Sequence, residues 1–283
     1  MDNYTINFSV DGQPVSEEEI HDMELSRYHH VFKIFNDKNI EIKKDNTIIP
    51  YEDLLRLPLS EAKEALAQTR ESIGKEKTLE LFKPEITRGD EMWTEIANNS
   101  REGVNMQEAY VDVEVHGISL VQFMMFNQLL AKENNLYMPS KIHPEHYYFD
   151  ADKAGNQVII ETFGMYKDPS YLDLKPGKIG PDFSVQPKEN ADIVMAGNTF
   201  LKNSGLNTKM LGMHQLSSTE DGMKIKLGVL LPEGAPKEIA EGHKWHLMVE
   251  FNNGLHIAAQ QHPSFIQKKV LETAIHHMAN KNK

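Results

Sequence analysis

The chain has 283 residues, and its 30 Lys and Arg against 42 Asp and Glu give a formal net charge of −12 at pH 7. An apolar fraction of 40% and a charged fraction of 25% exclude wholesale disorder, and the acidic balance without a long basic run argues against a nucleic-acid partner. The sequence has no Cys, which excludes disulfides, thiolate nucleophiles and iron–sulfur clusters.

The beginning of the chain carries no targeting signal that we can identify. Residues 1–20 have neither a basic region nor an apolar region of the kind that directs secretion. No later stretch approaches the roughly 18–20 consecutive apolar residues that a membrane helix needs. We therefore expect a cytoplasmic protein with no membrane partner.

Residues 1–100 are the more polar and more helical part of the sequence. Apolar residues recur at spacings of three and four between Leu54 and Ala67, as in an amphipathic helix that Pro58 begins or interrupts. The alternating residues 40–42, flanked by turn-like sequences, predict a short strand. We expect a mainly helical N-terminal region that packs on the body or forms an oligomer interface, and a homodimer stays open.

The pattern changes to that of strands from residue 101. Segments that alternate or run apolar after turn-like residues predict strands at Ala109–His116, Gln157–Phe163, Leu211–Leu216 and Met223–Leu231. Residues 118–133 are apolar without alternation and predict a buried helix. Residues 168–190 hold many Pro, Gly, Lys and Asp, which predicts a long loop wrapping the body.

A long helical stretch, Ala240 to Met278, ends the chain. It is interrupted at His262, because the residue before Pro263 is disfavoured in a helix. Strands followed by a long C-terminal helix predict an α+β domain over residues 101–283, with the helix laid across a curved antiparallel sheet.

His246 and Glu250 form the first candidate metal site. A spacing of four places both side chains on one helix face, a turn apart, and an imidazole nitrogen with a carboxylate oxygen suits zinc or another divalent ion. A buried Glu250 would be costly without a nearby cation. His243 lies on the same side and is a reserve candidate. The alternative is a hydrogen-bonded His–Glu pair without metal.

A second cluster lies at His143-Pro144-Glu145-His146, followed by three aromatic residues. Two His held by a proline suit a pocket wall that carries a ligand, although an exposed loop anchored by its aromatics would have the same sequence. Glu161 lies inside an apolar strand, where it either enters a site or faces solvent. His214 lies in another candidate strand and is either functional or an ordinary core or surface residue.

Taken together and in this order, these motifs resemble the family of 2,4-diacetylphloroglucinol hydrolase and phloretin hydrolase. The matching features cover about residues 103 to 255: Gly103-Val104-Asn105-Met106, His116-Gly117, His143-Pro144-Glu145, Glu161, His214, Thr219-Glu220-Asp221-Gly222, Leu227-Gly228 and His246-Leu247-Met248-Val249-Glu250-Phe251. The resemblance implies a Bet v 1-type helix-grip fold, in which an antiparallel sheet curls around the long C-terminal helix behind a helical N-terminal extension.

The resemblance also implies a zinc ion (Zn2+) held by two His and two Glu. Carried over to this sequence, the four ligands are His143, Glu161, His246 and Glu250. His146 competes with His143 for the first position. Four protein ligands fill a tetrahedral shell, so a catalytic site must expand its coordination or release one carboxylate.

The implied reaction is hydrolysis of the carbon–carbon bond that joins an acyl group to a phloroglucinol-type polyphenol ring. The ring must be held in a keto tautomer so that its carbon can leave, while zinc polarises the acyl carbonyl or lowers the pKa of a bound water to ~7. The resulting candidates are His146, His214 and Tyr147 for catalysis and Tyr148, His116 and Phe126 for binding the small aromatic substrate.

Three departures from the family pattern are visible. Residues 111–115 replace a tryptophan-rich segment, the stretch between His143 and Glu161 is shorter than expected, and residues 1–100 match poorly. Two other classes therefore stay open. One is a non-catalytic carrier of hydrophobic aromatic ligands in a helix-grip cavity, and the other is a metal-dependent hydrolase or lyase with a different substrate.

Overall fold

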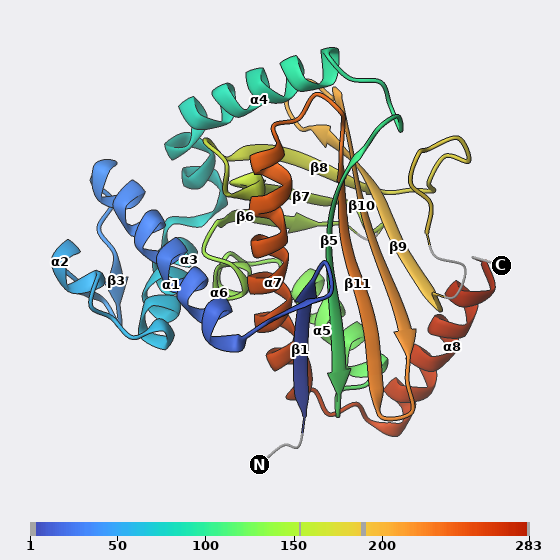
Figure 1. The fold of residues 1–283 in the computed structure, drawn as a ribbon. Helices are drawn as coiled ribbons and strands as arrows, with labels where there is room; N and C mark the ends of the chain where they lie inside the picture. The colour runs from blue at the N-terminus through green and yellow to red at the C-terminus, as the bar shows by residue number, and fades with distance from the viewer. Residues whose placement is uncertain (1–3, 153, 188–190, 282–283) are drawn as a thin grey trace.

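The computed structural model describes residues 4–152, 154–187 and 191–281, with side chains as far as residue 277. The chain folds as an α+β protein built on one large antiparallel sheet (Figure 1). Its strands are β1 Thr5–Val10, β2 Gln13–Val15, β3 Lys43–Lys44, β4 Thr47–Ile48, β5 Gln107–His116, β6 His146–Ala151, β7 Gln157–Glu161, β8 Ser170–Pro176, β9 Ile193–Leu201, β10 Asn207–Ser218 and β11 Gly222–Leu231. Its helices are α1 Glu17–Asp37, α2 Tyr51–Leu54, α3 Leu59–Leu81, α4 Lys83–Asn98, α5 Leu120–Glu133, α6 Tyr137–Ile142, α7 Lys237–Ala259 and α8 Phe265–Lys281, with a short 3-10 turn, η1, at Phe163–Met165.

The large sheet has nine strands in the order β2-β1-β5-β11-β10-β9-β8-β7-β6, and every neighbouring pair is antiparallel. From β6 to β11 each strand pairs with the next one along the chain. The last of them returns beside β5, with which it pairs from Gln107 to His116. The chain thus crosses the sheet once as a meander before α7 begins.

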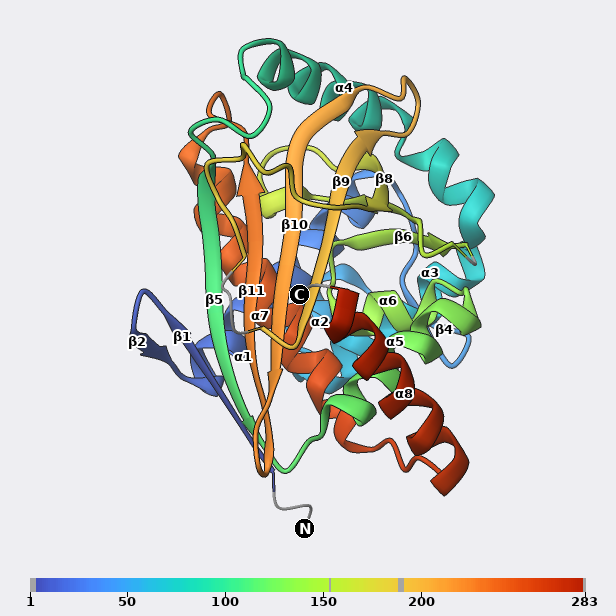
Figure 2. The same cartoon turned by 90° about the vertical axis from the view of Figure 1, so that its right-hand side faces the viewer.

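Helix α7 lies on one face of the sheet, against β5, β11 and β1 (Figures 1 and 2). Strand β5 explains this arrangement, because Ala109, Val111, Val113 and Val115 are buried and the residues between them are more exposed. The buried face joins the same core cluster as Leu247 of α7. The predicted strand at Ala109–His116 and the helix across the sheet are therefore confirmed.

The other predicted strands are confirmed in place, and the predicted helix after β5 is present but buried only in its first half. The segments Gln157–Phe163, Leu211–Leu216 and Met223–Leu231 fall in β7, β10 and β11, although β7 ends at Glu161 and Phe163 belongs to η1. Within residues 118–133, Leu120–Glu133 form α5, which begins after a capping box made by Ser119 and Gln122. The predicted break near His262 is confirmed too, since α7 ends at Ala259 and α8 begins at Phe265.

The prediction of one long loop over residues 168–190 is wrong in part. Residues 170–176 form β8, which pairs with β7 and β9. Prolines at both ends hide its alternation, in which Leu172 is buried and Tyr171 is not. Residues 177–187 do wrap the sheet face opposite α7, where Phe183 and Val185 pack with Met213. Residues 188–190 lie outside the described part of the chain.

The N-terminal region contributes more than helices. Strands β1 and β2 extend the large sheet beside β5, and α1 begins at a capping box between Ser16 and Glu19. The predicted strand at residues 40–42 is wrong, because Ile42 is buried under α1 and α3 and the small hairpin is β3 and β4. Helix α3 begins directly after Pro58, as predicted. In the described part of the chain, no helix is long and apolar enough to cross a membrane.

Candidate metal centre

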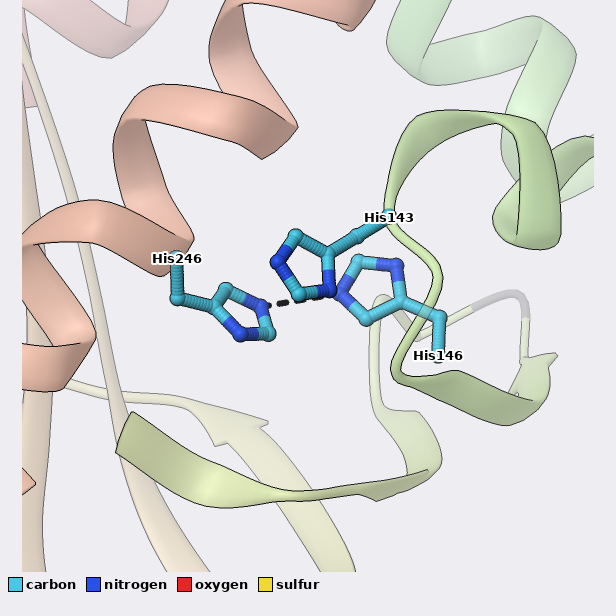
Figure 3. Close-up of side chains that lie close together, drawn as sticks. All are labelled: His143, His146 and His246. Carbon is cyan, nitrogen blue, oxygen red and sulfur yellow. Dashed lines mark hydrogen bonds between the residues drawn. The ribbon is translucent and has the colours of Figure 1, made fainter. Parts of the chain in front are cut away.

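Three histidines from distant parts of the chain meet inside the protein. His143 ends α6, His146 begins β6 and His246 lies on α7, and their candidate ligand atoms all lie within 4.8 Å of one another (Figure 3). His143 and His246 are buried, and 13% of the His146 side chain is exposed. The group could hold a metal ion, because imidazole nitrogens are common ligands of divalent metals.

The ring arrangement distinguishes the three histidines. Two imidazoles bound to one tetrahedral ion through ring nitrogens have centroids about 5 Å apart, given metal–nitrogen bonds of about 2 Å. The centroids of His146 and His246 are 5.1 Å apart, and their Nε2 atoms are 3.0 Å apart. His143 instead stacks on His246 at 3.8 Å, with 23° between the ring planes. This stacking makes His143 and His246 a poor pair of ligands for one ion.

Hydrogen bonds orient the two loop histidines differently. The backbone N–H of Glu145 donates to Nδ1 of His143 at 3.1 Å, so the neutral ring carries its proton on Nε2. That Nε2 is buried and has no hydrogen-bond partner among the described residues. The imidazole of His146 hydrogen-bonds to the Pro139 carbonyl, and its second nitrogen points toward α6 in Figure 3. Its Nε2 faces His246 and is hydrogen-bonded to Nε2 of that ring at 3.0 Å.

Two carboxylates approach the same point. The Oε2 atom of Glu161, at the end of β7, lies 3.6 Å from Nε2 of His146 and 3.8 Å from Nε2 of His246. Oε2 of Glu250, one turn further along α7, lies 3.9 Å from Nε2 of His246. These separations are long for hydrogen bonds and close to the roughly 3.3 Å expected between donors that share a tetrahedral ion.

Burial favours the neutral forms of the carboxyl groups and imidazoles in this cluster when no cation is bound. Loss of solvent raises the pKa of Glu161 well above its usual value, and the charges of Glu250 and Glu145 raise it further. Burial also raises the pKa of Glu250 to about 7 and lowers that of His146 to about 3. Neutral imidazoles keep their lone pairs, and buried carboxyls favour a nearby cation. These donors therefore fit a divalent metal.

Glu250 differs from Glu161 in its access to solvent. Its carboxyl is enclosed enough for burial to raise the pKa, yet 33% of its side-chain surface is accessible, against 6% for Glu161. Water therefore reaches part of the Glu250 side chain, next to the imidazole of His246. This position suits a ligand that can be displaced when another molecule binds.

A close approach of two backbones brings the candidate ligands of α7 and β7 together. Gly164, in η1 directly after β7, has a φ of +62°, and a Cβ there would lie 2.3 Å from the Ile239 carbonyl of α7. A Cβ on Gly242 would lie 1.9 Å from the Gly164 carbonyl. Only glycine fits such contacts. As a result, α7 rests directly on the segment that follows Glu161, one turn before His246.

Tyr147 and Tyr148, which we predicted to be site residues, do not lie at the histidine cluster. Tyr147 is buried among the helices of the N-terminal region, where its ring lies 4.5 Å from that of Phe82 and 4.6 Å from the Arg70 guanidinium. Tyr148 packs edge-on against Tyr171 at 6.0 Å. Both rings face the N-terminal helices, so the contacts that hold them are those of a core.

Two predicted substrate contacts also lie elsewhere. His116 is exposed at the end of β5, where its Nδ1 lies 2.8 Å from the Asp221 carboxylate. Phe126 packs between Phe123 of α5 and Gly254 of α7. Neither side chain belongs to the cluster of His143, His146 and His246.

His214 and His243 lie next to the group without joining it. The ring of His243 stacks on that of His246 at 4.9 Å and on Phe163 at 4.1 Å. His214, on β10, faces Phe251 at 5.3 Å and accepts a hydrogen bond at Nδ1 from the Gly228 N–H. Burial lowers the pKa of His214 to about 4. Both rings are therefore neutral near pH 7.

Sequence reasoning did not identify the arginines that contact the His143–His146 loop. Arg27 binds the Glu145 carboxylate, and Arg70 donates to loop carbonyls. Arg27 gives no local signal. Arg70 lies four residues after Leu66 on the apolar face of α3, and a charged residue at such a position is a signal that could have been used.

Comparison with known proteins gives no assignment, because no protein-family model matches the chain and no curated protein matches it significantly.

Proposed function

We propose that this protein is a zinc-dependent hydrolase that cleaves the carbon–carbon bond between an acyl group and a phloroglucinol-type ring. The observation that carries the proposal is the contact between His146 and His246, with Glu161 near both rings and Glu250 near His246. Two imidazoles and two carboxylates are the donor set that the sequence resemblance implies. These four side chains come from a loop, a strand and a helix, each of which contained one of the candidate motifs in the sequence.

The order of the elements supports a helix-grip arrangement of the Bet v 1 type. Strand β5 is followed by α5 and α6, then by the meander from β6 to β11 that returns beside β5, and finally by α7 across the sheet. Such a fold presents a space between a long helix and a curved sheet, where an aromatic ligand can be enclosed. Residues 1–100 extend this unit with two strands and the N-terminal helices.

We assign the ligand role in the loop to His146 instead of His143. His146 and His246 have the ring separation expected of two ligands, and their Nε2 atoms face each other at 3.0 Å. The acceptor role of Nδ1 in His143 leaves the ring proton on Nε2. In this proposal His143 supports the ring of His246 by stacking on it. Nitrogen and carboxylate donors that can surround one ion tetrahedrally suit zinc.

Other residues of the chain would bind the substrate ring and transfer protons. A bound divalent ion would supply polarisation of the acyl carbonyl and acidification of a water. His214, neutral and with Nδ1 occupied by the Gly228 N–H, presents its Nε2–H toward the α7 side of the sheet. It can donate to a ring oxygen and favour the keto form, whereas a pKa of about 4 leaves too little imidazolium for it to act as an acid at pH 7.

The reaction adds the elements of water across one bond. Hydroxide adds to the acyl carbon, the ring carbon leaves with the bonding electrons, and a proton is delivered to that carbon. The products are a carboxylic acid and the free phloroglucinol-type ring. Glu250, next to the group and accessible to water, is placed to hold the proton that is transferred.

The proposal is tested by incubating the zinc-loaded protein with phloretin and with monoacyl- and diacylphloroglucinols, followed by product identification. We expect release of the carboxylic acid and the free ring, and no release by the His246→Ala variant. An unchanged substrate panel with zinc-loaded protein would refute the proposed activity. Tight binding of these phenols by metal-free protein, without turnover, would indicate a carrier of aromatic ligands.

A further inference from the structure

The loop that carries His143 and His146 is held by two arginines from the N-terminal helices. Nε of Arg27, on α1, donates to Oε2 of Glu145 at 3.1 Å, and its NH2 group donates to Oε1 of the same carboxylate. The Glu145 side chain is fully buried, and 16% of Arg27 is exposed. The same residue, Glu145, donates its backbone N–H to His143. Arg27 therefore holds the middle of the loop through the side chain of Glu145.

Arg70 holds the backbone of the same loop. It is almost completely buried on α3 and donates to the carbonyls of Pro144 at 2.5 Å and His146 at 3.0 Å. Its guanidinium also lies over the Tyr147 ring. Together the two arginines fix a carboxylate and two carbonyls within three consecutive residues. Bidentate arginine contacts have the rigidity that such fixing needs.

This placement is electrostatically unfavourable for a cation site. Burial is the main cause that lowers the pKa of both His143 and His246, and the positive charge of Arg27 lowers each of them further. A residue that contributed only charge would weaken the binding of a divalent cation. The geometric contribution of Arg27 must therefore exceed its Coulombic cost if it supports the site.

We infer that Arg27 is a positioning residue of the metal centre, which acts by fixing Glu145, the residue directly before His146 in the ligand loop. The inference rests on the proposed metal site. It gives the N-terminal helices a role, since α1 and α3 then complete the centre whose ligands all lie beyond residue 140. Removing a direct hydrogen-bond partner of a metal ligand typically weakens metal binding by roughly 10–100-fold, and Arg27 acts one residue further away, through the residue next to His146.

The test compares full-length Arg27→Met and wild-type protein for zinc affinity and for the visible spectrum of the cobalt-loaded form. Zinc affinity is measured by competition with a chromophoric chelator. We expect Arg27→Met to bind zinc roughly 10–100-fold more weakly and to show altered cobalt bands, with partial recovery in Arg27→Lys. The opposite sign, tighter zinc binding in Arg27→Met, is what loss of a nearby positive charge alone would produce, and it would overturn the inference.

Arg88→Met is the matched control. Arg88 makes a bidentate pair with Asp168 at 2.8 and 2.6 Å, also from an N-terminal helix but outside the loop, and its loss should leave zinc affinity and the cobalt bands unchanged. Glu145→Gln, which keeps the shape of the side chain and the N–H to His143, serves if Arg27→Met does not fold. Circular dichroism of the metal-free variants checks folding.

The outcomes separate this inference from the proposed function. Wild-type protein that binds no zinc or cobalt would refute the metal centre itself. Wild-type binding together with folded Arg27→Met and Glu145→Gln variants of unchanged affinity and spectrum would refute only the positioning role. If the metal-free variants are less stable to heat but bind zinc and cobalt like the wild type, the Arg27–Glu145 pair contributes to folding alone. That result would also refute the positioning role.

Discussion

His143 and His146 are separated by two residues, yet their rings have different surroundings. The ring of His143 stacks on His246 and accepts a backbone N–H, while His146 directs Nε2 toward His246. Histidine ligands are generally oriented by the hydrogen bond of their other nitrogen. The assignment of His146 as the ligand follows from that difference.

Replacing each of these two histidines separates a ligand from a stacking partner. His143→Phe keeps an aromatic ring against His246 and removes both nitrogens, so we expect near-stoichiometric zinc with less than about a tenfold loss of affinity. His146→Ala removes a ligand and should abolish stoichiometric zinc. Metal analysis of the purified variants measures both, and zinc lost from His143→Phe but kept in His146→Ala would reverse our assignment.

His214 predicts a pH dependence of stability in the metal-free protein. Its folded pKa of about 4 lies below the value of 6.5 for an unburied histidine, so only the unfolded chain takes up this proton between pH 6.5 and 4. The free energy of unfolding should therefore fall as the pH decreases through that range, with no effect above it. One pKa unit corresponds to about 1.4 kcal/mol.

The variant His214→Asn isolates this contribution, because the Asn oxygen can still accept the Gly228 N–H. Urea unfolding of both proteins in the presence of a chelator, at several pH values from 4 to 8, should show a smaller loss of stability for the variant below pH 6.5. Parallel curves for the two proteins would contradict the buried, neutral state of His214.

The sequence predicted part of this site at the residue scale. The four-residue spacing of His246 and Glu250 and the His-Pro-Glu-His motif drew attention to the correct segments. The choice between His143 and His146 could not be predicted, because it depends on the Glu145 N–H and the Pro139 carbonyl. Tyr147 and Tyr148 were misplaced for a related reason, since their partners Phe82 and Tyr171 are far away in the chain.

At the scale of elements, the contact between α7 and η1 sets the distance between helix and strand ligands. Gly242→Ala would place a Cβ 1.9 Å from a backbone carbonyl, which cannot move as a flexible side chain can. We expect α7 to shift, a loss of about 1–3 kcal/mol in the free energy of unfolding, and weaker zinc binding. Chemical denaturation and metal competition measure these two effects.

Gly254→Ala is the control on the same helix. Its Cβ would meet only the Phe126 ring, at 3.0 Å, and replacing glycine within a helix favours folding by up to about 1 kcal/mol. Zinc affinity should stay unchanged. Equal losses of zinc affinity in both variants would show that the α7–η1 contact has no special role.

Elements with a regular pattern were predicted well, and those interrupted by their surroundings were not. β5 and the first half of β11 alternate because one face of each is buried on the α7 side, whereas residues 227–231 of β11 are buried on both faces. β8 was missed because prolines flank it, and residues 40–42 were misassigned because Ile42 enters a core between helices. Local alternation does not distinguish a strand from a buried connection.

At the scale of the whole molecule, a bound ion would connect a loop, the sheet and α7. We expect zinc to raise the unfolding temperature of the metal-free protein, by an amount that corresponds to about 2.7 kcal/mol when free zinc is 100 times its Kd. Differential scanning calorimetry with and without zinc measures this change. Magnesium should have little effect, because it prefers oxygen ligands and octahedral geometry, and an equal effect of both ions would indicate nonspecific binding.

The assembly of the centre could not be predicted from sequence patterns, since its parts are contributed by segments from Arg27 to Glu250. Composition and periodicity indicated an α+β protein with a helix across a sheet. They did not show that β1 and β2 join that sheet, or that α1 and α3 hold the ligand loop. Those contacts link residues more than 70 positions apart, which local patterns do not encode.

The most direct test of the metal centre is elemental analysis of the purified protein beside its His246→Ala variant, both folded by circular dichroism. We predict about one zinc per wild-type chain and almost none in the variant, because His246 contacts His146, Glu161 and Glu250. Wild-type protein that holds no divalent metal even after incubation with zinc, or a variant that holds as much as the wild type, would contradict this account.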